Sequence, residues 1–201
     1  MSVIEIAFLH LINDPSSIDR HWPAITSKLI TPNPGIVTGG HGVISYQNDQ
    51  SVQDDDLTKV LVIEWRDQRA FYDFANSDQA KTFQHSIKPL LRAPPDLEMY
   101  NADRPIPAAF GSKEVVEIVR VSVPDADDYE RVRSVWMEDI GLEEAVLCGT
   151  NFNKVDKNLF IGVLLWNSFE EQASVEKQWV TPLSAIGEVS TYVLPITPIA
   201  L

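Results

Sequence analysis

A histidine in a glycine-rich segment is the residue of this chain best suited to proton transfer. His41 follows Gly39 and Gly40 and precedes Gly42, and glycine within a strand often marks close approach by a ligand or another backbone. An imidazole changes charge near neutral pH and can act as general acid or base. We therefore expect His41 to be catalytic, the alternative being a hydrogen-bonded structural histidine.

Carboxylates that interrupt apolar segments form a second group of candidates. Glu5 and Glu64 lie in runs that are otherwise largely apolar, where a lone carboxylate has a raised pKa and can act as a base. Glu117 repeats Glu5 in the second half of the chain, which favours a shared structural role. Glu5 is nevertheless a catalytic candidate, as is the pair of Tyr72 and His85 on either side of a predicted helix break.

Aromatic side chains near these positions are candidates for the wall of a substrate pocket. His10 and Phe8 share one face of the first predicted strand, which lines either that pocket or the core. The other expected pocket residues are aromatic and equally compatible with a core position: Tyr46, Trp65, Phe74 and Phe83.

Motifs for metals and cofactors are absent from the sequence. The four histidines are scattered, without the H-x-H or H-x-x-x-H spacing of a metal site. No G-x-G-x-x-G, Walker or G-x-S-x-G motif occurs. We therefore expect no cofactor and no metal.

Composition argues against several classes of partner. The 29 acidic and 16 basic residues give a net charge of −13, which disfavours binding to nucleic acid. No apolar run approaches the ~20 residues of a membrane span, and Cys148 is the single cysteine. These features predict a cytoplasmic protein with no nucleic-acid or membrane partner.

The elements that position the candidates are clearest between Lys59 and Leu91. The apolar run from Val60 to Trp65 predicts a strand covered on both faces. Helical spacing follows, broken at Asn76-Ser77-Asp78, where Ser77 is the expected N-cap of a second helical stretch that ends near Pro89.

The same order of elements recurs in the second half of the chain. Trp166 repeats Trp65 at an offset of 101 residues, and Glu117 repeats Glu5 at an offset of 112. An internal duplication follows, with residues 1–103 and 114–201 as two β-α-β-β-α-β, ferredoxin-like modules of the α+β class. Prolines and glycine in the 104–113 linker predict no helix or strand there. After Trp166 we expect one helix that ends near Leu183.

One segment resembles a known superfamily. The run from Glu64-Trp65 through Phe71, Phe74 and Asn76-Ser77-Asp78 to Leu90-Leu91 resembles the dimeric α/β-barrel superfamily, in its antibiotic-biosynthesis-monooxygenase-like and stress-responsive branches. Members usually pair two one-module chains, whereas this chain resembles tandem members found in fungal secondary-metabolite gene clusters. The resemblance implies an intrachain dimeric α/β barrel, possible homodimers of the two-module chain, and a hydrophobic small-molecule substrate.

Two catalytic patterns of the superfamily do not match this chain. The haem-degrading branch has a tryptophan and a histidine where this chain has Phe74 and Gln84, and His85 is one residue out of register. The tyrosine and histidines of the olivetolic-acid-cyclase-like branch align with Phe74, Ala80 and Glu5. Neither haem degradation nor that cyclase dyad is therefore expected.

The resemblance and the candidates together lead to a functional hypothesis. We expect a cofactor-free enzyme, of monooxygenase or cyclase type, that acts on an aromatic or polyketide-like molecule in secondary metabolism. The alternative is a non-catalytic small-molecule-binding or stress-response barrel. Since His41 aligns with Leu147-Cys148-Gly149 in the second module, we expect at most one functional pocket per chain, in the first module.

Overall fold

Each half of the chain contains the expected succession of strands and helices. The computed structural model describes residues 2–52, 57–139, 145–152 and 158–199. Module 1 contains β1 (Ser2–His10), α1 (Pro15–Ile30), β2 (Ile36–Val43), β3 (Tyr46–Gln47), β4 (Gln50–Ser51), β5 (Thr58–Trp65), α2 (Gln68–Ala75), α3 (Asp78–Ile87), the 3-10 helix η1 (Lys88–Leu90) and β6 (Asp96–Ala102). Module 2 contains β7 (Val115–Val123), η3 (Ala126–Asp128), α4 (Tyr129–Asp139), β8 (Ala145–Asn151), β9 (Asn158–Trp166), α5 (Phe169–Ser174), α6 (Val180–Ser184), β10 (Glu188–Pro195) and β11 (Thr197–Pro198).

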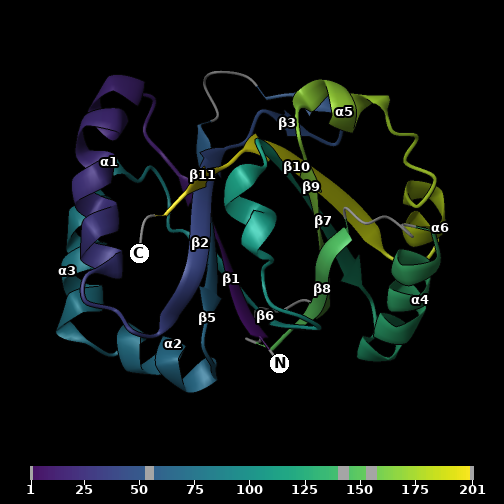
Figure 1. Cartoon of the computed structure of the whole chain (residues 1–201), viewed down its shortest axis with the longest axis horizontal. Helices are drawn as coiled ribbons and strands as arrows, with labels where there is room; N and C mark the ends of the chain where they lie inside the picture. The colour runs from purple at the N-terminus through teal and green to yellow at the C-terminus, as the bar shows by residue number, and fades with distance from the viewer. Residues whose placement is uncertain (1, 53–56, 140–144, 153–157, 200–201) are drawn as a thin grey trace.

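The strands of both modules form one antiparallel sheet. Its order is β11-β2-β5-β1-β6-β8-β9-β7-β10-β3-β4, so each module has the ferredoxin-like arrangement. The modules join where β6 pairs with β8 and where β10 pairs with β3. Because two residues separate β2 from β3, the second pairing brings the ends of the sheet together. The expected intrachain barrel is confirmed, with helices on its outside (Figure 1).

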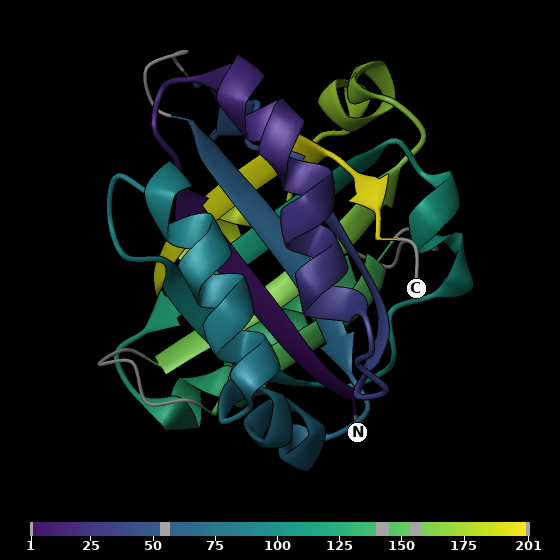
Figure 2. The same cartoon turned by 90° about the vertical axis from the view of Figure 1, so that its left-hand side faces the viewer.

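Three hydrophobic cores explain why the strands are apolar on both faces. Alternate residues of β1 divide between two cores: Ile4, Ile6 and Phe8 lie inside the barrel, and Val3, Ala7 and Leu9 lie under the helices of module 1. Figure 2 shows α1 and α3 crossing the outer face of the module 1 sheet. A third core fills the space between the module 2 sheet and its helices.

The linker contains a helix that the sequence did not predict. The 3-10 helix η2 (Ala108–Ser112) is the teal helical turn between the two halves of the barrel in Figure 1. Ile106 and Phe110 are buried in the barrel core, and the backbone N–H of Ile106 donates to Glu64 Oε2 at 3.0 Å. Burial of these side chains stabilises the turn despite its prolines and glycine, and it gives Glu64 a structural role.

One further element differs from expectation, and a short hairpin follows β2. The polar loop after β2 contains the β3–β4 hairpin, whose turn residues Asn48 and Asp49 have φ of 51° and 61°, a conformation that Asn and Asp tolerate. The helix expected after Trp166 is two short helices, α5 and α6. In module 1 the predicted cap is confirmed, since the Ser77 side chain accepts a hydrogen bond from Ala80 N–H at the start of α3.

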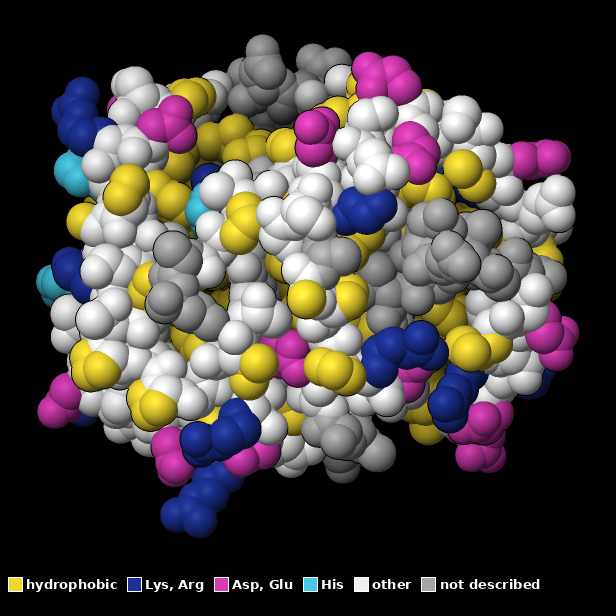
Figure 3. Space-filling model, viewed as in Figure 1, with side chains coloured by type: hydrophobic (Ala, Val, Ile, Leu, Met, Phe, Trp, Pro, Cys, Tyr) yellow, Lys and Arg dark blue, Asp and Glu magenta, His cyan; other side chains and the backbone are white. Residues whose placement is uncertain are grey.

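None of the described helices combines the length and apolar character needed to cross a bilayer. On the face shown in Figure 3, Lys and Arg side chains lie among Asp and Glu side chains rather than in one basic patch.

Candidate functional site

A cavity of about 580 Å³ lies in module 1 between the outer face of the sheet and helices α2 and α3. Its floor consists of buried residues of β1 and β5, namely Glu5, Ala7, Leu9 and Leu61. Phe71, Phe74 and Phe83 contribute aromatic walls. The volume lies within the range of about 300–1,000 Å³ that is typical of small-molecule sites.

Glu5 is the acidic group of this cavity. Trp65 Nε1 donates a hydrogen bond to Glu5 Oε2 at 2.8 Å, and no other hydrogen bond to the Glu5 side chain is made by the described residues. Burial raises the pKa of Glu5 to about 7, against the lowering effect of the Trp65 hydrogen bond. Glu5 as a whole residue is 8% exposed and lines the cavity. Its carboxyl is therefore held at one oxygen, at the floor of the cavity.

The indole that holds Glu5 is fixed by aromatic packing. Trp65 is fully buried, and its ring centroid lies 5.6 Å from that of Phe71 and 5.3 Å from that of Phe74. Since both phenylalanines also line the cavity, the same side chains shape the apolar wall and orient the carboxylate.

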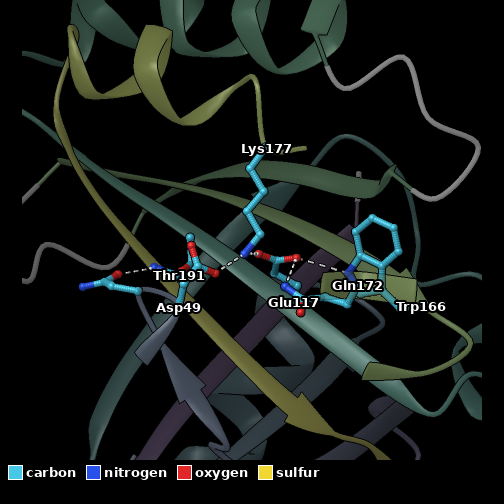
Figure 4. Close-up of polar contacts among 7 residues, drawn as sticks. Asp49, Glu117, Trp166, Gln172, Lys177 and Thr191 are labelled. Atoms are coloured by element: carbon cyan, nitrogen blue, oxygen red, sulfur yellow. Dashed lines mark hydrogen bonds and ion pairs between the residues drawn. The ribbon is translucent and has the colours of Figure 1, made fainter. Parts of the chain in front are cut away.

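Module 2 contains the same carboxylate and indole pair, but there the carboxylate has further polar partners (Figure 4). Trp166 Nε1 donates to Glu117 Oε2 at 3.2 Å, and Gln172 Nε2 donates to the same oxygen at 3.1 Å. Lys177 Nζ lies 2.8 Å from Glu117 Oε1 and also pairs with Asp49 of module 1. Although burial alone would lower it, hydrogen bonds to Asp49 and Glu117 raise the pKa of Lys177.

The two carboxylates differ in their surroundings: Glu117 of module 2 is enclosed by polar partners, whereas Glu5 of module 1 lines a cavity. Glu117 is 0% exposed and neutralised by Lys177, and it does not line the nearby cavity of about 410 Å³. Gln172 stands 101 residues after Phe71, the offset that also relates Trp166 to Trp65. An amide and an ammonium thus satisfy Glu117, whereas aromatic rings surround the site of Glu5.

His41 lies outside this cavity. It is half-buried beneath α1, with its ring centroid 5.3 Å from that of Trp22. Burial and the neighbouring Lys59 ammonium lower the pKa of His41 to about 4. The imidazole is therefore neutral and weakly basic at pH 7, and the geometry does not support the catalytic role expected of it.

The glycines around His41 make room for the chain itself. A Cβ at Gly42 would overlap the carbonyl oxygen of Pro195, and one at Gly40 would lie 2.9 Å from Ile196 and Phe110. The glycines therefore accommodate the end of β10 and the η2 side chains. The expected close approach occurs, but the approaching group is protein.

The remaining predicted residues lie in three other places. His10 and Phe8 face the barrel interior, where they line a cavity of about 240 Å³; His10 Nε2 lies 3.1 Å from Asp96 Oδ2. Tyr46 packs on Phe169 of module 2, with ring centroids 5.9 Å apart. The predicted pair Tyr72 and His85 is exposed on the helices, and neither residue lines the Glu5 cavity.

The structure thus brings together Glu5, Trp65, Phe74 and Phe83 from the predicted set. Sequence reasoning missed Gln84, Lys88 and Arg92, which also line the cavity. Helical spacing carries a partial signal for them, because Ala80, Gln84, Lys88 and Leu91 recur at intervals of three or four residues. Among the described residues, no group of three His, Cys, Asp or Glu side chains is placed to share a metal ion.

Comparisons with solved structures identify the fold. An anthrone oxidase-like protein superposes with a TM-score of 0.69 at 10% identity, over 97% of this chain and 91% of that one. The chain is a tandem dimeric α/β barrel. Candidate monooxygenases from Fusobacterium nucleatum subsp. nucleatum and Lactobacillus acidophilus NCFM give TM-scores of 0.65 and 0.60, at 11% and 13% identity. These two cover 99% of this tandem barrel, and 93% and 94% of their own chains.

At such identities the likeness establishes the fold, so function must be argued from the site. Neither a protein-family model nor a curated protein sequence matches the tandem barrel.

Proposed function

We propose that this chain is a cofactor-independent oxygenase of an aromatic, polyketide-like molecule, with the module 1 cavity as its active site and Glu5 as its general base. The observation that carries the proposal is a buried carboxyl, with a pKa raised to about 7, at the floor of an apolar cavity. A general base is most effective when its pKa lies near the working pH.

The apolar wall supports an aromatic substrate. Phe71, Phe74 and Phe83 offer ring faces and edges against which a planar molecule can pack. The fold shared with an anthrone oxidase-like protein supports choosing a three-ring ketone with an activated CH₂ group as the first molecule to test. Such a CH₂ is acidic because its anion is delocalised over the rings and the carbonyl.

Glu5 would perform the proton transfers of the oxidation. The Glu5 carboxylate removes a proton from the CH₂ group, and the resulting carbanion passes one electron to O₂. The substrate radical and superoxide combine to a peroxide anion, which takes a proton from the Glu5 carboxylic acid. Loss of water from the hydroperoxide leaves a ketone, so that R₂CH₂ and O₂ give R₂C=O and H₂O.

Trp65 would keep this base in position. Its N–H holds Glu5 Oε2, so proton transfer would involve the other oxygen, Oε1. The aromatic packing around Trp65 limits rotation of the carboxylate, and apolar walls limit the water that could quench the carbanion.

The experiment measures O₂ uptake and ketone formation with 1,8-dihydroxyanthrone. The wild-type protein should consume one O₂ per ketone formed, and Glu5→Gln should lower the rate by about 10²- to 10⁴-fold. The matched control is the double variant Glu117→Gln/Lys177→Met, which removes the equivalent carboxylate and its cation together and should retain the wild-type rate.

Three results would contradict the proposal in different ways. Equal rates in wild type and Glu5→Gln would remove Glu5 as the base. Binding of the anthrone with no oxidation above the buffer rate would favour a non-catalytic binding protein. Loss of rate in the double variant alone would move the active site to module 2.

A further inference from the structure

A second group of polar side chains lies under α1, outside the Glu5 cavity. Trp22 is on the buried face of α1, and its ring centroid lies 5.3 Å from that of His41. Lys59 Nζ lies 4.3 Å from the centroid of the same indole. None of these three residues, which we call the Lys59 cluster, lines the Glu5 cavity.

The pairing of β2 with β5 brings the two basic side chains of the cluster together. His41 pairs with Leu61, and Val43 pairs with Lys59, so His41 and Lys59 are diagonal neighbours on the outer face of the sheet, a spacing that long side chains can bridge. Figure 3 shows a His side chain and a Lys or Arg side chain next to each other in the recess beside α1. His41 is only half-buried, so solvent reaches the cluster from this side.

The N–H groups of the Lys59 cluster lack acceptors. Trp22 is 5% exposed, and its Nε1–H has no hydrogen-bond partner among the described residues. Lys59 is 7% exposed. Neither its ammonium nor the His41 imidazole forms a hydrogen bond or ion pair with the part of the chain that the structure describes. Since buried donors in native proteins are nearly always satisfied, the cluster calls for an acceptor that the chain does not supply.

The Lys59 cluster carries one positive charge at neutral pH. Burial and the Lys59 ammonium lower the pKa of His41 to about 4, so the imidazole is neutral. The indole face stabilises the ammonium but supplies no negative charge. Burial lowers the pKa of Lys59, and Asp19, exposed on α1, opposes this from a distance. A single buried positive charge favours a partner with a single negative charge, and Asp19 disfavours a second one.

We infer that the Lys59 cluster is a binding site for a small monocarboxylate, separate from the proposed active site and independent of the proposed function. The ammonium lies over the face of the indole, whereas the indole N–H points outward from its edge. One carboxylate oxygen can accept from Lys59 and the other from Trp22 Nε1–H, and such charge-assisted hydrogen bonds are strong. The neutral imidazole of His41 adds a third N–H donor. A halide, with a single centre, would match these separated donors less well.

The indole N–H signals of the ¹⁵N-labelled protein test the site directly, with acetate as the probe. Trp22→Phe assigns the Trp22 signal, and acetate, chloride and phosphate are each added as sodium salts at one pH and equal ionic strength. Trp65 and Trp166 are internal controls, because their N–H groups already donate to Glu5 and Glu117.

Two lysine variants locate the bound anion. Lys59→Met removes the charge of the cluster and replaces it with an apolar side chain that suits the buried site. Lys28→Met is the matched control on α1, where Lys28 Nζ donates to Ser86 Oγ at 2.6 Å.

Acetate should shift the Trp22 N–H signal downfield to saturation, with a midpoint of about 1–10 mM, and should hardly move those of Trp65 and Trp166. Lys59→Met should weaken binding at least about tenfold, and Lys28→Met should leave it unchanged. A Trp22 signal that acetate does not move, or that moves equally in Lys59→Met, would overturn the inference. Equal effects of chloride or phosphate would overturn the assignment of a carboxylate and indicate an adventitious anion site.

Discussion

Replacing Glu5 by glutamine should stabilise the protein at neutral and alkaline pH. Glutamine has nearly the same shape and can still accept the Trp65 hydrogen bond through its amide oxygen. It carries no charge, so it avoids the cost of an ionised carboxylate in a site where burial raises the pKa of Glu5 to about 7.

The size of the effect follows from the two pKa values. Taking the ordinary value of 4.5 for the unfolded chain, the difference of 2.5 from the native value of about 7 corresponds to about 3 kcal/mol at 1.36 kcal/mol for each pKa unit. Between these pH values the native protein binds a proton that the unfolded chain has lost. The stability that neutral Glu5 provides is therefore complete below pH 4.5 and is lost as the pH rises through 7.

The assay is urea unfolding of wild type and Glu5→Gln from pH 4 to pH 8.5. The two proteins should have nearly equal free energies of unfolding at pH 4. The variant should be more stable by about 3 kcal/mol at pH 8.5, or about 6–12 °C in Tm. Glu117→Gln is the control of opposite sign, because it removes one of the two acidic partners of the half-buried Lys177 and should destabilise by about 1–3 kcal/mol. Parallel pH profiles for wild type and Glu5→Gln would refute the reasoning.

Three other substitutions test the positions of residues around the site and the barrel. His41→Ala should change the rate of anthrone oxidation less than about threefold, because His41 packs on Trp22 outside the cavity; a loss of tenfold or more would contradict this placement. Gly42→Ala should lower the free energy of unfolding by about 1–3 kcal/mol, since its Cβ would overlap Pro195; an unchanged urea midpoint would show that β10 does not pass so closely. Phe110→Ala should cost about 3–5 kcal/mol because the ring is buried in the barrel core; a cost below about 1 kcal/mol would indicate that η2 is not packed there.

Local sequence determined the elements that were predicted correctly. The apolar run ending at Trp65 forms β5, and Ser77 caps α3 as expected. These features depend on periodicity and on hydrogen bonds within a few residues. The β3–β4 hairpin and η2 depend on distant partners instead: Tyr46 pairs with Val193, and Phe110 enters a core built by both modules.

The sequence indicated a candidate site residue where an ionisable side chain interrupts an apolar strand. Glu5 stood out as a carboxylate in an apolar strand, and its cavity confirms that environment. The glycines near His41 correctly signalled close approach, but glycine does not reveal what approaches. Gln84 and Lys88 escaped notice because they line the cavity only through the packing of α3 and η1 against the sheet.

Direct titration of the Glu5 carboxyl by ¹³C NMR tests the central claim most simply. The Glu5→Gln spectrum assigns the signal, and wild type is titrated with and without a neutral aromatic ligand such as anthracene-2-carboxamide. A midpoint near pH 7, shifted further upward when the ligand displaces water from the cavity, is the expected result. A midpoint near 4.5 that the ligand leaves unchanged would contradict a buried base facing the substrate cavity.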